Sequence, residues 1–257
     1  MKINKKFFYD NLTTIFYALI IAIIIRSLLF QPFYIPSSSM EPNLLVGDRL
    51  FVSKYTYGYS RHSFPFSPNF SDSRIMFKEP KRGDVIVFKT SYKNDDIFLI
   101  RMICKLLTSC KTDYIKRLIG LPGDNIQFIY GDLFINNAQV IKTKIKNFNS
   151  ELNCGDNKCI SFKEKLPGGV THNTIYRKQN AYNKTIEFNV PKDHYFFLGD
   201  NRDNSSDSRY FGYVNKADLV GKARIIFFST NKKKGNIFQI WKWFEIIQWN
   251  RFFNLIN

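Results

Sequence analysis

Three adjacent hydroxyl side chains occupy the segment Ile-Pro-Ser-Ser-Ser-Met-Glu-Pro at residues 35–42. They are Ser37, Ser38 and Ser39, and prolines flank them on both sides. A serine hydroxyl is a weak nucleophile until a neighbouring base takes its proton. Taken alone, the segment is equally typical of a polar loop, so nucleophilic chemistry requires a base from elsewhere in the chain.

Lys116 is the candidate base, in the segment Tyr-Ile-Lys-Arg-Leu-Ile at residues 114–119. A lysine in water has a pKa of about 10.4 and is therefore protonated at neutral pH. Burial among apolar side chains disfavours the ammonium ion and lowers this pKa. Tyr114, Ile115, Leu118 and Ile119 are available to form such an apolar wall. The alternative is an ordinary solvated lysine beside the arginine that follows it.

The histidines offer a weaker route to the same chemistry. A Ser-His-Asp triad requires an imidazole, and the chain has three of them, His62, His172 and His194. His194 precedes Asp200 by six residues, but a short spacing along one strand does not build triad geometry. No cysteine is adjacent to a histidine, so a thiol protease has little support. A serine–lysine pair is the variant of the same logic that needs no imidazole.

Charged residues are concentrated in Gly-Asp-Asn-Arg-Asp-Asn-Ser-Ser-Asp-Ser-Arg, residues 199–209. We predict that Asp200, Asp207 and Arg209 are structural and brace this loop through charge-assisted hydrogen bonds. A metal site built on its three aspartates is disfavoured, because arginines are interleaved among the carboxylates. No glycine-rich phosphate loop occurs. We therefore expect no metal and no cofactor.

An apolar segment, LTTIFYALIIAIIIRSLLF at residues 12–30, precedes the serines. Its nineteen residues span about 28 Å as a helix, close to the thickness of a hydrocarbon core. Its single charge, Arg26, is near enough to the end to reach the head groups. A cleaved signal peptide is the alternative, but the small residues of a cleavage site are missing. We predict a single-pass anchor in the cell (inner) membrane, with residues 1–11 in the cytoplasm and the remainder on the outer, periplasmic side.

Alternating and β-branched runs dominate the chain beyond this anchor. Predicted strands lie at residues 49–54, 84–89, 125–130, 132–136, 185–190 and 222–228. The pair Gly131-Asp132 between two of these runs indicates a tight hairpin. The predicted fold is mainly β: an antiparallel-sheet catalytic domain with a small inserted β lobe and one N-terminal transmembrane helix.

The predicted domain boundaries follow from these elements. Residues 31–130 and 185–232 form the antiparallel-sheet domain, and residues 131–184 form the inserted lobe. The tail, residues 233–257, is rich in Trp and Phe. Its polar residues recur at every third position from Gln239 onward, which smears the polar face around an α-helix. An interfacial membrane helix and a helix packed on the domain core both remain open.

Composition limits the class of partner. Lys and Arg number 38 against 21 Asp and Glu, a formal charge of +17, while 44% hydrophobic residues argue against disorder. The basic residues are scattered and no nucleic-acid-binding motif accompanies them, so we expect no nucleic acid as a partner. Two cysteine pairs, Cys104 with Cys110 and Cys154 with Cys159, indicate local disulfides outside the cytosol. Reduced thiols and a zinc site are the alternatives.

Three long segments resemble the bacterial type I signal peptidases, also called leader peptidases. They are the Ser-Met-Glu-Pro segment, residues 114–124 (Tyr-Ile-Lys-Arg-Leu-Ile-Gly-Leu-Pro-Gly-Asp) and the segment that begins Gly199-Asp-Asn-Arg-Asp. The resemblance implies a membrane-bound serine endopeptidase with Ser39 as nucleophile and Lys116 as general base. It also implies that the Ser39 amide and the Ser37 hydroxyl are oxyanion donors. Ser205 would be a hydrogen-bond partner of the lysine.

The same resemblance implies the partners, which are exported preproteins cut after small residues, and membrane lipid. Its pocket residues would be Phe33, Ile35, Pro36, Met40, Leu44, Leu50, Val87, Tyr114 and Ile115, although each is also typical of ordinary core. The nucleophile follows the anchor by nine residues, which holds it near the membrane surface where a preprotein's cleavage site emerges.

The chain departs from the family pattern in three places. The segment between Phe88 and Tyr114 is longer than the fold needs, the polar lobe around residues 148–181 is compact, and a single anchor is evident. Two other functions stay open: a serine–lysine peptidase that matures one dedicated partner, and a membrane-tethered β domain that only binds peptides. A self-cleaving repressor is disfavoured, because the N-terminal segment is a membrane span where a DNA-binding domain would be required.

Overall fold

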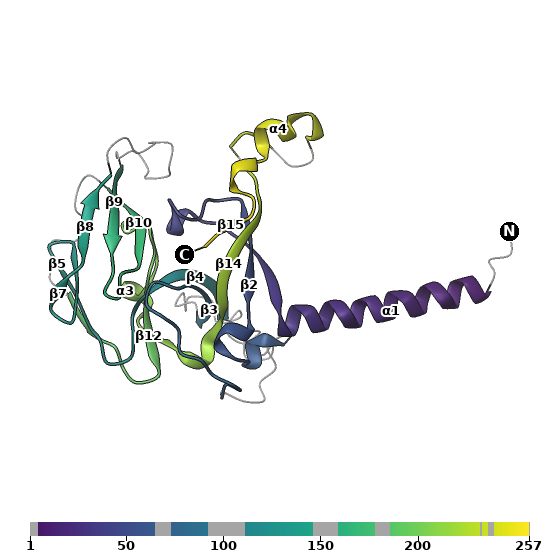
Figure 1. The fold of residues 1–257 in the computed structure, drawn as a ribbon, viewed down its shortest axis with the longest axis horizontal. Coiled ribbons are helices and arrows are strands. Elements are labelled where there is room, and N and C mark those ends of the chain that lie inside the picture. Colours follow the sequence, from purple (N-terminus) through teal and green to yellow (C-terminus); the bar gives the residue numbers. More distant parts are fainter. Residues whose placement is uncertain are drawn as a thin grey trace, which may run out of the picture.

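The computed structural model describes residues 5–64, 73–91, 111–145, 159–177, 186–231, 233–235 and 239–256. A long N-terminal helix, α1 (Lys5–Leu28), stands away from a β-rich body (Figure 1). It contains a candidate membrane span, Tyr9–Leu28, of which only 6% is buried. A helix that is apolar and exposed all round has no protein core to pack against, which suits a bilayer. The N-terminal apolar helix expected from the sequence is thus confirmed.

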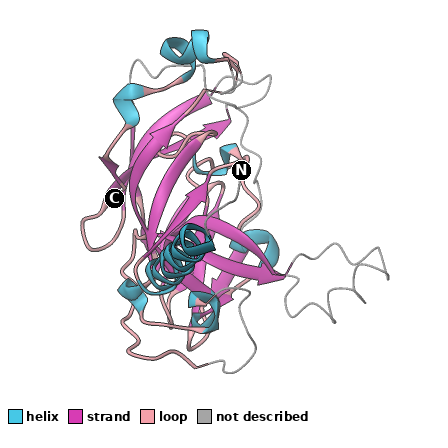
Figure 2. Cartoon of the chain, turned by 90° about the vertical axis from the view of Figure 1, so that its right-hand side faces the viewer, coloured by secondary structure: helices cyan, strands magenta, loops and turns pink. Residues whose placement is uncertain are grey.

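The largest sheet has eight strands in the order β1-β2-β14-β3-β4-β12-β13, with β15 paired to β14. Neighbouring strands within it pair antiparallel, and its long curved strands are seen in Figure 2. The strands are β1 (Phe30–Tyr34), β2 (Asp48–Ser53), β3 (Val85–Ser91), β4 (Lys111–Gly120), β12 (His194–Leu198), β13 (Val214–Asn215), β14 (Leu219–Ser229) and β15 (Asn254–Leu255).

Two smaller sheets lie on the side of the body away from α1 (Figure 1). One has the order β11-β5-β6-β7, formed by β5 (Asn125–Ile129), β6 (Asp132–Ile135), β7 (Ala138–Gln139) and β11 (Ile186–Asn189). The other has the order β10-β9-β8, formed by β8 (Ile141–Lys144), β9 (Cys159–Lys165) and β10 (Thr171–Arg177). The first sheet joins residues on both sides of the expected boundary between residues 130 and 131.

The turn between β5 and β6 shows how local sequence sets the register. Ile129 pairs with Asp132, which leaves a two-residue loop. Both loop residues have positive φ, 50° at Tyr130 and 87° at Gly131. Two-residue hairpin loops of this handedness match the twist of the flanking strands, and glycine enters the left-handed region without steric cost. The tight hairpin predicted at Gly131-Asp132 is confirmed.

Short helices connect the strands. They are α3 (Ser208–Phe211), α4 (Trp243–Ile246) and the 3-10 turns Ser38–Met40, Tyr55–Tyr57, Arg61–Ser63, Lys216–Asp218, Ile240–Lys242 and Trp249–Arg251. The described part of the tail therefore consists of two 3-10 turns, the one-turn helix α4 and the short strand β15. Its polar residues at every third position suit this series of turns better than one continuous helix. Neither form of long tail helix considered from the sequence is present among the described residues.

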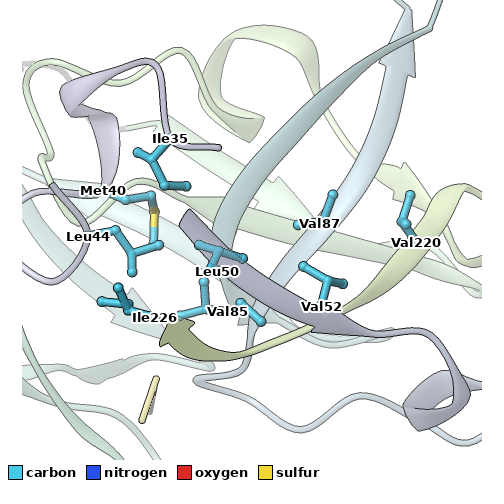
Figure 3. Close-up of a cluster of buried hydrophobic side chains, with 10 residues drawn as sticks. Ile35, Met40, Leu44, Leu50, Val52, Val85, Val87, Val220 and Ile226 are labelled. Atoms are coloured by element: carbon cyan, nitrogen blue, oxygen red, sulfur yellow. The ribbon is translucent and has the colours of Figure 1, made fainter. Parts of the chain in front are cut away.

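Three buried clusters fill the body. The first lies between β1, β2, β3 and β14 and is shown in Figure 3, where Met40 and Leu44 from the β1–β2 connection point toward Leu50. The second packs the β5–β6 hairpin against β4 and β12. The third is aromatic, with Phe88 stacked on Phe197 at 4.4 Å between ring centroids. The chain segments around Ser39 and Lys116 are therefore anchored by apolar packing.

The predicted antiparallel, mainly β fold is confirmed. The six predicted strands correspond to β2, β3, β5, β6, β11 and β14, each within three residues of its observed limits. Strands β4 and β12 were not predicted, because most of their residues are buried on both faces and lack an alternating pattern. Cys159 is disulfide-bonded, while Cys104, Cys110 and Cys154 lie outside the described residues. The long segment between Phe88 and Tyr114 also lies mostly outside them.

Candidate active site

Ser39 lies in the 3-10 turn Ser38–Met40, which follows shortly after the end of β1. The side chain of Met40 is completely buried in the first cluster and fixes this turn against the core. Asn201 fixes its other side, because its amide nitrogen donates to the Ser39 carbonyl at 3.1 Å and its side chain donates to the Ser38 carbonyl at 3.2 Å. The position of the Ser39 hydroxyl is thus held from two directions.

Lys116 enters the same place from β4, where it pairs with Ile86 of β3. Its Nζ donates a hydrogen bond to Ser39 Oγ at 2.6 Å. The lysine is 3% exposed and the serine 8%. Two polar groups separated by 77 residues in the chain thus meet in a site largely closed to water.

Burial lowers the pKa of Lys116 from 10.5 to about 8. The main cause is desolvation of the ammonium ion, and the nearby Arg209 guanidinium acts in the same direction. Asp207 and Asp200 oppose the shift because their negative charges stabilise the ammonium. With this pKa, part of the Lys116 amine is neutral at physiological pH. The neutral amine is the form that can take a proton from a hydroxyl group.

The two supporting serines occupy different positions relative to the pair. Ser37 Oγ lies 3.3 Å from Ser39 Oγ, so these hydroxyls share one site. Ser205 is buried, and its Oγ has no hydrogen-bond partner among the described residues. The hydrogen bond to Lys116 expected for Ser205 is therefore not formed in this structure. A β-carbon placed on Gly199 would overlap Ser205 Oγ and lie 2.5 Å from the Ser39 carbonyl oxygen. Both serines therefore pack closely against this glycine.

Buried ion pairs brace the loop that follows β12. Asp200 is completely buried and receives two hydrogen bonds from Arg117, at 2.8 and 2.9 Å. Although burial by itself would raise the pKa of Asp200, Arg117 holds that pKa below its usual range. Asp207 caps α3 and accepts from the Gly199 amide at 3.0 Å and from Arg209 at 2.8 Å. The three charged residues predicted to be structural therefore lie in this frame.

A further group of buried residues was not singled out from the sequence. Arg202 donates to Glu164 of β9 at 2.6 Å and to the Tyr176 hydroxyl of β10 at 3.1 Å. His172 lies beside them, 3.6 Å from Glu164, and its pKa is lowered to about 4, chiefly by burial and then by nearby arginines. Neutral His172 fits between cations without adding charge. Arg202 belongs to the charged segment at residues 199–209, but no local pattern around Glu164 indicates this long-range pairing.

Strand β10 also pairs directly with the loop. The Ile175 amide donates to the Asp200 carbonyl, and the Arg202 amide donates to the Ile175 carbonyl, each at 3.0 Å. Asn43 links the same region to the Ser39 segment, because its side-chain amide donates to the Asn173 carbonyl and to Asp200, both at 2.7 Å. The β9–β10 hairpin thus stands behind the loop that contacts Ser39.

The expected pocket residues divide into two groups. Ile35, Met40, Leu44, Leu50 and Val87 are fully buried members of the first cluster (Figure 3). Phe33 and Ile115 are partly buried against that cluster, Tyr114 packs against the aromatic cluster, and Pro36 is exposed. The first group forms the core beneath the site, and the second retains surface from which a ligand can be contacted.

The site contains no recognisable metal-ligand set. Within the described ranges, no group of three His, Cys, Asp or Glu side chains converges as metal ligands do. The carboxylates nearest Lys116 are instead paired with arginines. The arrangement suits acid–base and nucleophilic chemistry by side chains alone.

Comparison with known proteins gives a consistent result. Residues 9–228 match the family described as signal peptidase, peptidase S26. A signal peptidase I of Rickettsia akari is 37% identical over 94% of this chain and 91% of its own length. One from Rickettsia canadensis is 39% identical over 92% of this chain and 89% of its own length. A crystal structure of a signal peptidase I from Enterococcus faecalis is 28% identical, covers 56% of this chain and 97% of its own, and has a TM-score of 0.31.

The sequence matches define the class first: this is a serine endopeptidase, and its helix α1 is long and apolar enough to cross a membrane. More specifically, the chain belongs to the signal peptidase family, peptidase S26, and is a protease of the signal peptidase I type that removes signal peptides. The resemblance noted from the three sequence segments is thereby confirmed.

Gly199→Ala tests the packing that positions Ser39. The new methyl group must displace Ser205 or the Ser39 backbone, and a shift of about 1 Å at a catalytic group costs roughly 10²-fold in rate. We therefore expect kcat for signal-peptide cleavage to fall about 100-fold in protein whose circular dichroism is unchanged. Gly120→Ala is the matched control, because its methyl group meets Phe196 and Val190 in the second cluster. It should lower stability and leave kcat near wild type; equal kcat losses in both variants would contradict the assignment.

Glu164→Gln tests the buried pairing behind the loop. Removing one charge of a buried ion pair leaves Arg202 without its compensating anion, so the free energy of unfolding should fall by about 3 kcal/mol. The measurement is chemical denaturation in detergent. Asp132→Asn breaks the partly exposed pair with Lys142 and should cost under about 1 kcal/mol. Equal effects of the two substitutions would show that Glu164 does not stabilise the hairpin contact.

Proposed function

We propose that the protein removes N-terminal signal peptides from exported preproteins by acyl-enzyme chemistry at a Ser39–Lys116 dyad. The observation that carries the proposal is the 2.6 Å distance between Lys116 Nζ and Ser39 Oγ at a buried position. At this distance a neutral amine takes the hydroxyl proton directly, with no intervening water.

The reaction has two halves that use the same base. Ser39 Oγ attacks the scissile carbonyl carbon while its proton passes to Lys116, and the ammonium then protonates the leaving amine of the mature protein. The C–N bond is broken and an ester on Ser39 remains. Neutral Lys116 next takes a proton from water, whose oxygen attacks the ester, and the ammonium returns that proton to Ser39 as the signal peptide leaves. No external reductant, oxidant or cofactor enters this balance.

The negative oxygen that develops during each attack needs hydrogen-bond donors. Ser37 Oγ, 3.3 Å from Ser39 Oγ, lies within reach of an oxygen on the attacked carbon. The Ser39 amide is the second proposed donor, since it lies in the first turn of a 3-10 helix, where amides lack an intrahelical partner. Ser205 is proposed as a partner of Lys116 in the liganded enzyme, which would satisfy its buried hydroxyl.

The surface beside the dyad supports selection of small residues. Phe33, Tyr114 and Ile115 keep part of their side chains exposed above the fully buried first cluster. Because that cluster is close-packed and rigid, pockets between these side chains are shallow, and larger substrate residues would clash. We infer that cleavage follows small residues one and three positions before the cut.

The strand pairing of β4 near the dyad supports an extended substrate. Among the described residues, the N-terminal half of β4 through Lys116 pairs with β3 only, since β12 pairs with Arg117, Leu118 and Gly120. A peptide added as a strand along this edge gains main-chain hydrogen bonds and places alternate side chains toward the core. The scissile bond would then lie beside Lys116 and Ser39.

The proposed orientation follows from the anchor. Lysines precede the apolar span Tyr9–Leu28, which places residues 1–11 in the cytoplasm and the β domain on the outer, periplasmic side, in contact with lipid head groups. The Leu29 amide still donates to the Ile25 carbonyl of the helix, and the Lys54 amide donates to the Leu29 carbonyl, so the end of β2 lies beside the end of α1. The cleavage site of a membrane-bound preprotein emerges at this same depth.

Ser39→Ala and Lys116→Met each test the dyad. We expect either change to lower cleavage of a preprotein in detergent by about 10⁴-fold or more, as loss of a nucleophile or its base does in other serine proteases. Lys54→Met is the matched control, because Lys54 is also buried, with a pKa lowered to about 8, but bonds the Ser63 carbonyl. Its kcat should stay near wild type. Cleavage by Lys116→Met at the wild-type rate would contradict the dyad, and a peptide-binding domain would be insensitive to all three changes.

The pH dependence tests the charge state of the base. Because the neutral amine is the active form and the pKa of Lys116 is about 8, kcat/KM should rise about tenfold per pH unit below pH 8 and level off above it. A substrate without groups that titrate between pH 6 and 10 isolates the enzyme's contribution. A rate that is flat from pH 6 to 9, or a limb centred near the pKa of an exposed lysine, would argue against a buried neutral Lys116. Cleavage of several unrelated preproteins at similar kcat/KM would separate a general enzyme from one dedicated to a single partner.

A further inference from the structure

Asn43 has a side chain that joins separate parts of the molecule. It lies in the connection between β1 and β2, four residues after Ser39. Its Nδ2 atom donates to the Asn173 carbonyl of β10 and to Asp200 Oδ2, both at 2.7 Å. Its backbone carbonyl accepts from Arg251 at 3.0 Å, so the main chain is held as well. One amide group therefore links the segment of the nucleophile to the loop after β12 and to the β9–β10 hairpin.

The two contacts explain why a primary amide suits position 43. Both partners are oxygen atoms, so the amide must direct its NH₂ group toward them and not its own oxygen. This group has two hydrogen atoms, and each has an acceptor here. The hydroxyl of a serine or threonine has a single hydrogen and would serve only one of the two acceptors. A carboxylate at this position would repel the carboxylate of Asp200.

Asn43 also continues the hydrogen bonding along one edge of β10. Alternate residues of an antiparallel strand direct their backbone groups to the same edge. Ile175 uses this edge to pair with the loop after β12, because its amide donates to the Asp200 carbonyl at 3.0 Å. The Asn173 carbonyl, two residues earlier in the strand, accepts from Asn43. The side chain of Asn43 thus extends the contact between the hairpin and the site by one more hydrogen bond.

We propose that Asn43 is a positioning residue of the reaction, which holds the connection bearing Ser39 against Asp200 and thereby fixes Ser39 Oγ relative to Lys116 Nζ. The inference rests on the dyad proposed above. Rate depends steeply on the placement of reacting groups, so a side chain that contacts neither member of the dyad can still control turnover.

The path from Asp200 to both members of the dyad is short. The residue after it, Asn201, donates from its amide to the Ser39 carbonyl at 3.1 Å. On the side of the base, Arg117 follows Lys116 in β4 and donates to the carboxylate of Asp200 at 2.8 and 2.9 Å. The segments of the nucleophile and of the base therefore meet at this one carboxylate, and Asn43 binds the same oxygen as the second of these arginine bonds.

The same contact influences the charge state of Lys116. The groups that act on this amine are the Tyr114 ring of its own strand, the Ser39 hydroxyl, and Asp200, Asp207 and Arg209 from the loop after β12 and from α3. The N–H group of Asn43 directs the positive end of its dipole at Asp200. Without that dipole the negative charge of Asp200 is less compensated. The ammonium form is then favoured, and the pKa of Lys116 rises.

Asn43→Leu tests the proposal, because it removes both donors and keeps roughly the shape of the side chain. We expect kcat for preprotein cleavage in detergent to fall about tenfold, with KM near wild type. The rising limb of kcat/KM against pH should move upward by about half a pH unit. Asn125→Leu is the matched control, because the Asn125 amide nitrogen also bridges two oxygen atoms, those of Glu187 and Asn189, within the sheet β11-β5-β6-β7. It should change neither kcat nor the position of the limb.

Asn43→Ser keeps one of the two donors and serves if the leucine variant does not fold. Its limb should also lie above that of the wild type. A limb at the wild-type position in the folded Asn43 variants would overturn the proposal, and so would an equal loss of kcat in Asn43→Leu and Asn125→Leu. The proposed catalysis is tested separately by Lys116→Met. If that variant is inactive while the Asn43 variants behave as wild type, only the positioning role is wrong.

Discussion

The site depends on keeping the Lys116 amine out of water without leaving it as an unpaired buried charge. An isolated buried ammonium is costly, and proteins relieve that cost by shifting its pKa. Here desolvation lowers the pKa to about 8, while the more distant carboxylates Asp207 and Asp200 limit the shift. If either carboxylate were unpaired and closer, the ammonium would be favoured at neutral pH. The arginines that bind these carboxylates therefore help to keep the pKa of Lys116 low.

This electrostatic constraint accounts for the charged loop after β12. Arg117 is adjacent to Lys116 in β4, but its side chain goes to the opposite face of the strand and pairs with Asp200. Arg202 reaches away from the dyad to Glu164 of β9. A strand that alternates its side chains between two faces thus separates Lys116, the proposed base, from Arg117 and its partner Asp200. The β9–β10 hairpin supplies Glu164, the anion that pairs with Arg202 and holds its side chain away from the dyad.

The sequence predicted the fold class, because strand alternation, turn glycines and the apolar anchor are local signals. The resemblance supplied the Ser39–Lys116 pairing, since residues 77 positions apart cannot be brought together by periodicity alone. The Glu164–Arg202 pair was not predicted, because each partner lies in an ordinary polar segment and only tertiary packing joins them. The tail was undecided for a related reason: a repeat of three fits short 3-10 turns, and exposure of its aromatic residues depends on packing against β14.

Several separate parts of the molecule converge on the short connection between β1 and β2. The membrane helix enters it through β1, and the charged loop holds its Ser38 and Ser39 carbonyls through Asn201. The β9–β10 hairpin contacts it through the hydrogen bond from the Asn43 side chain to the Asn173 carbonyl. The tail reaches it through Arg251. A Ser39 hydroxyl fixed to so many elements keeps its distance to Lys116 whatever happens to any one exposed loop. The proposed reaction gains more from this rigidity than from a mobile site, since misplacement of a catalytic group by about 1 Å already costs roughly 10²-fold in rate.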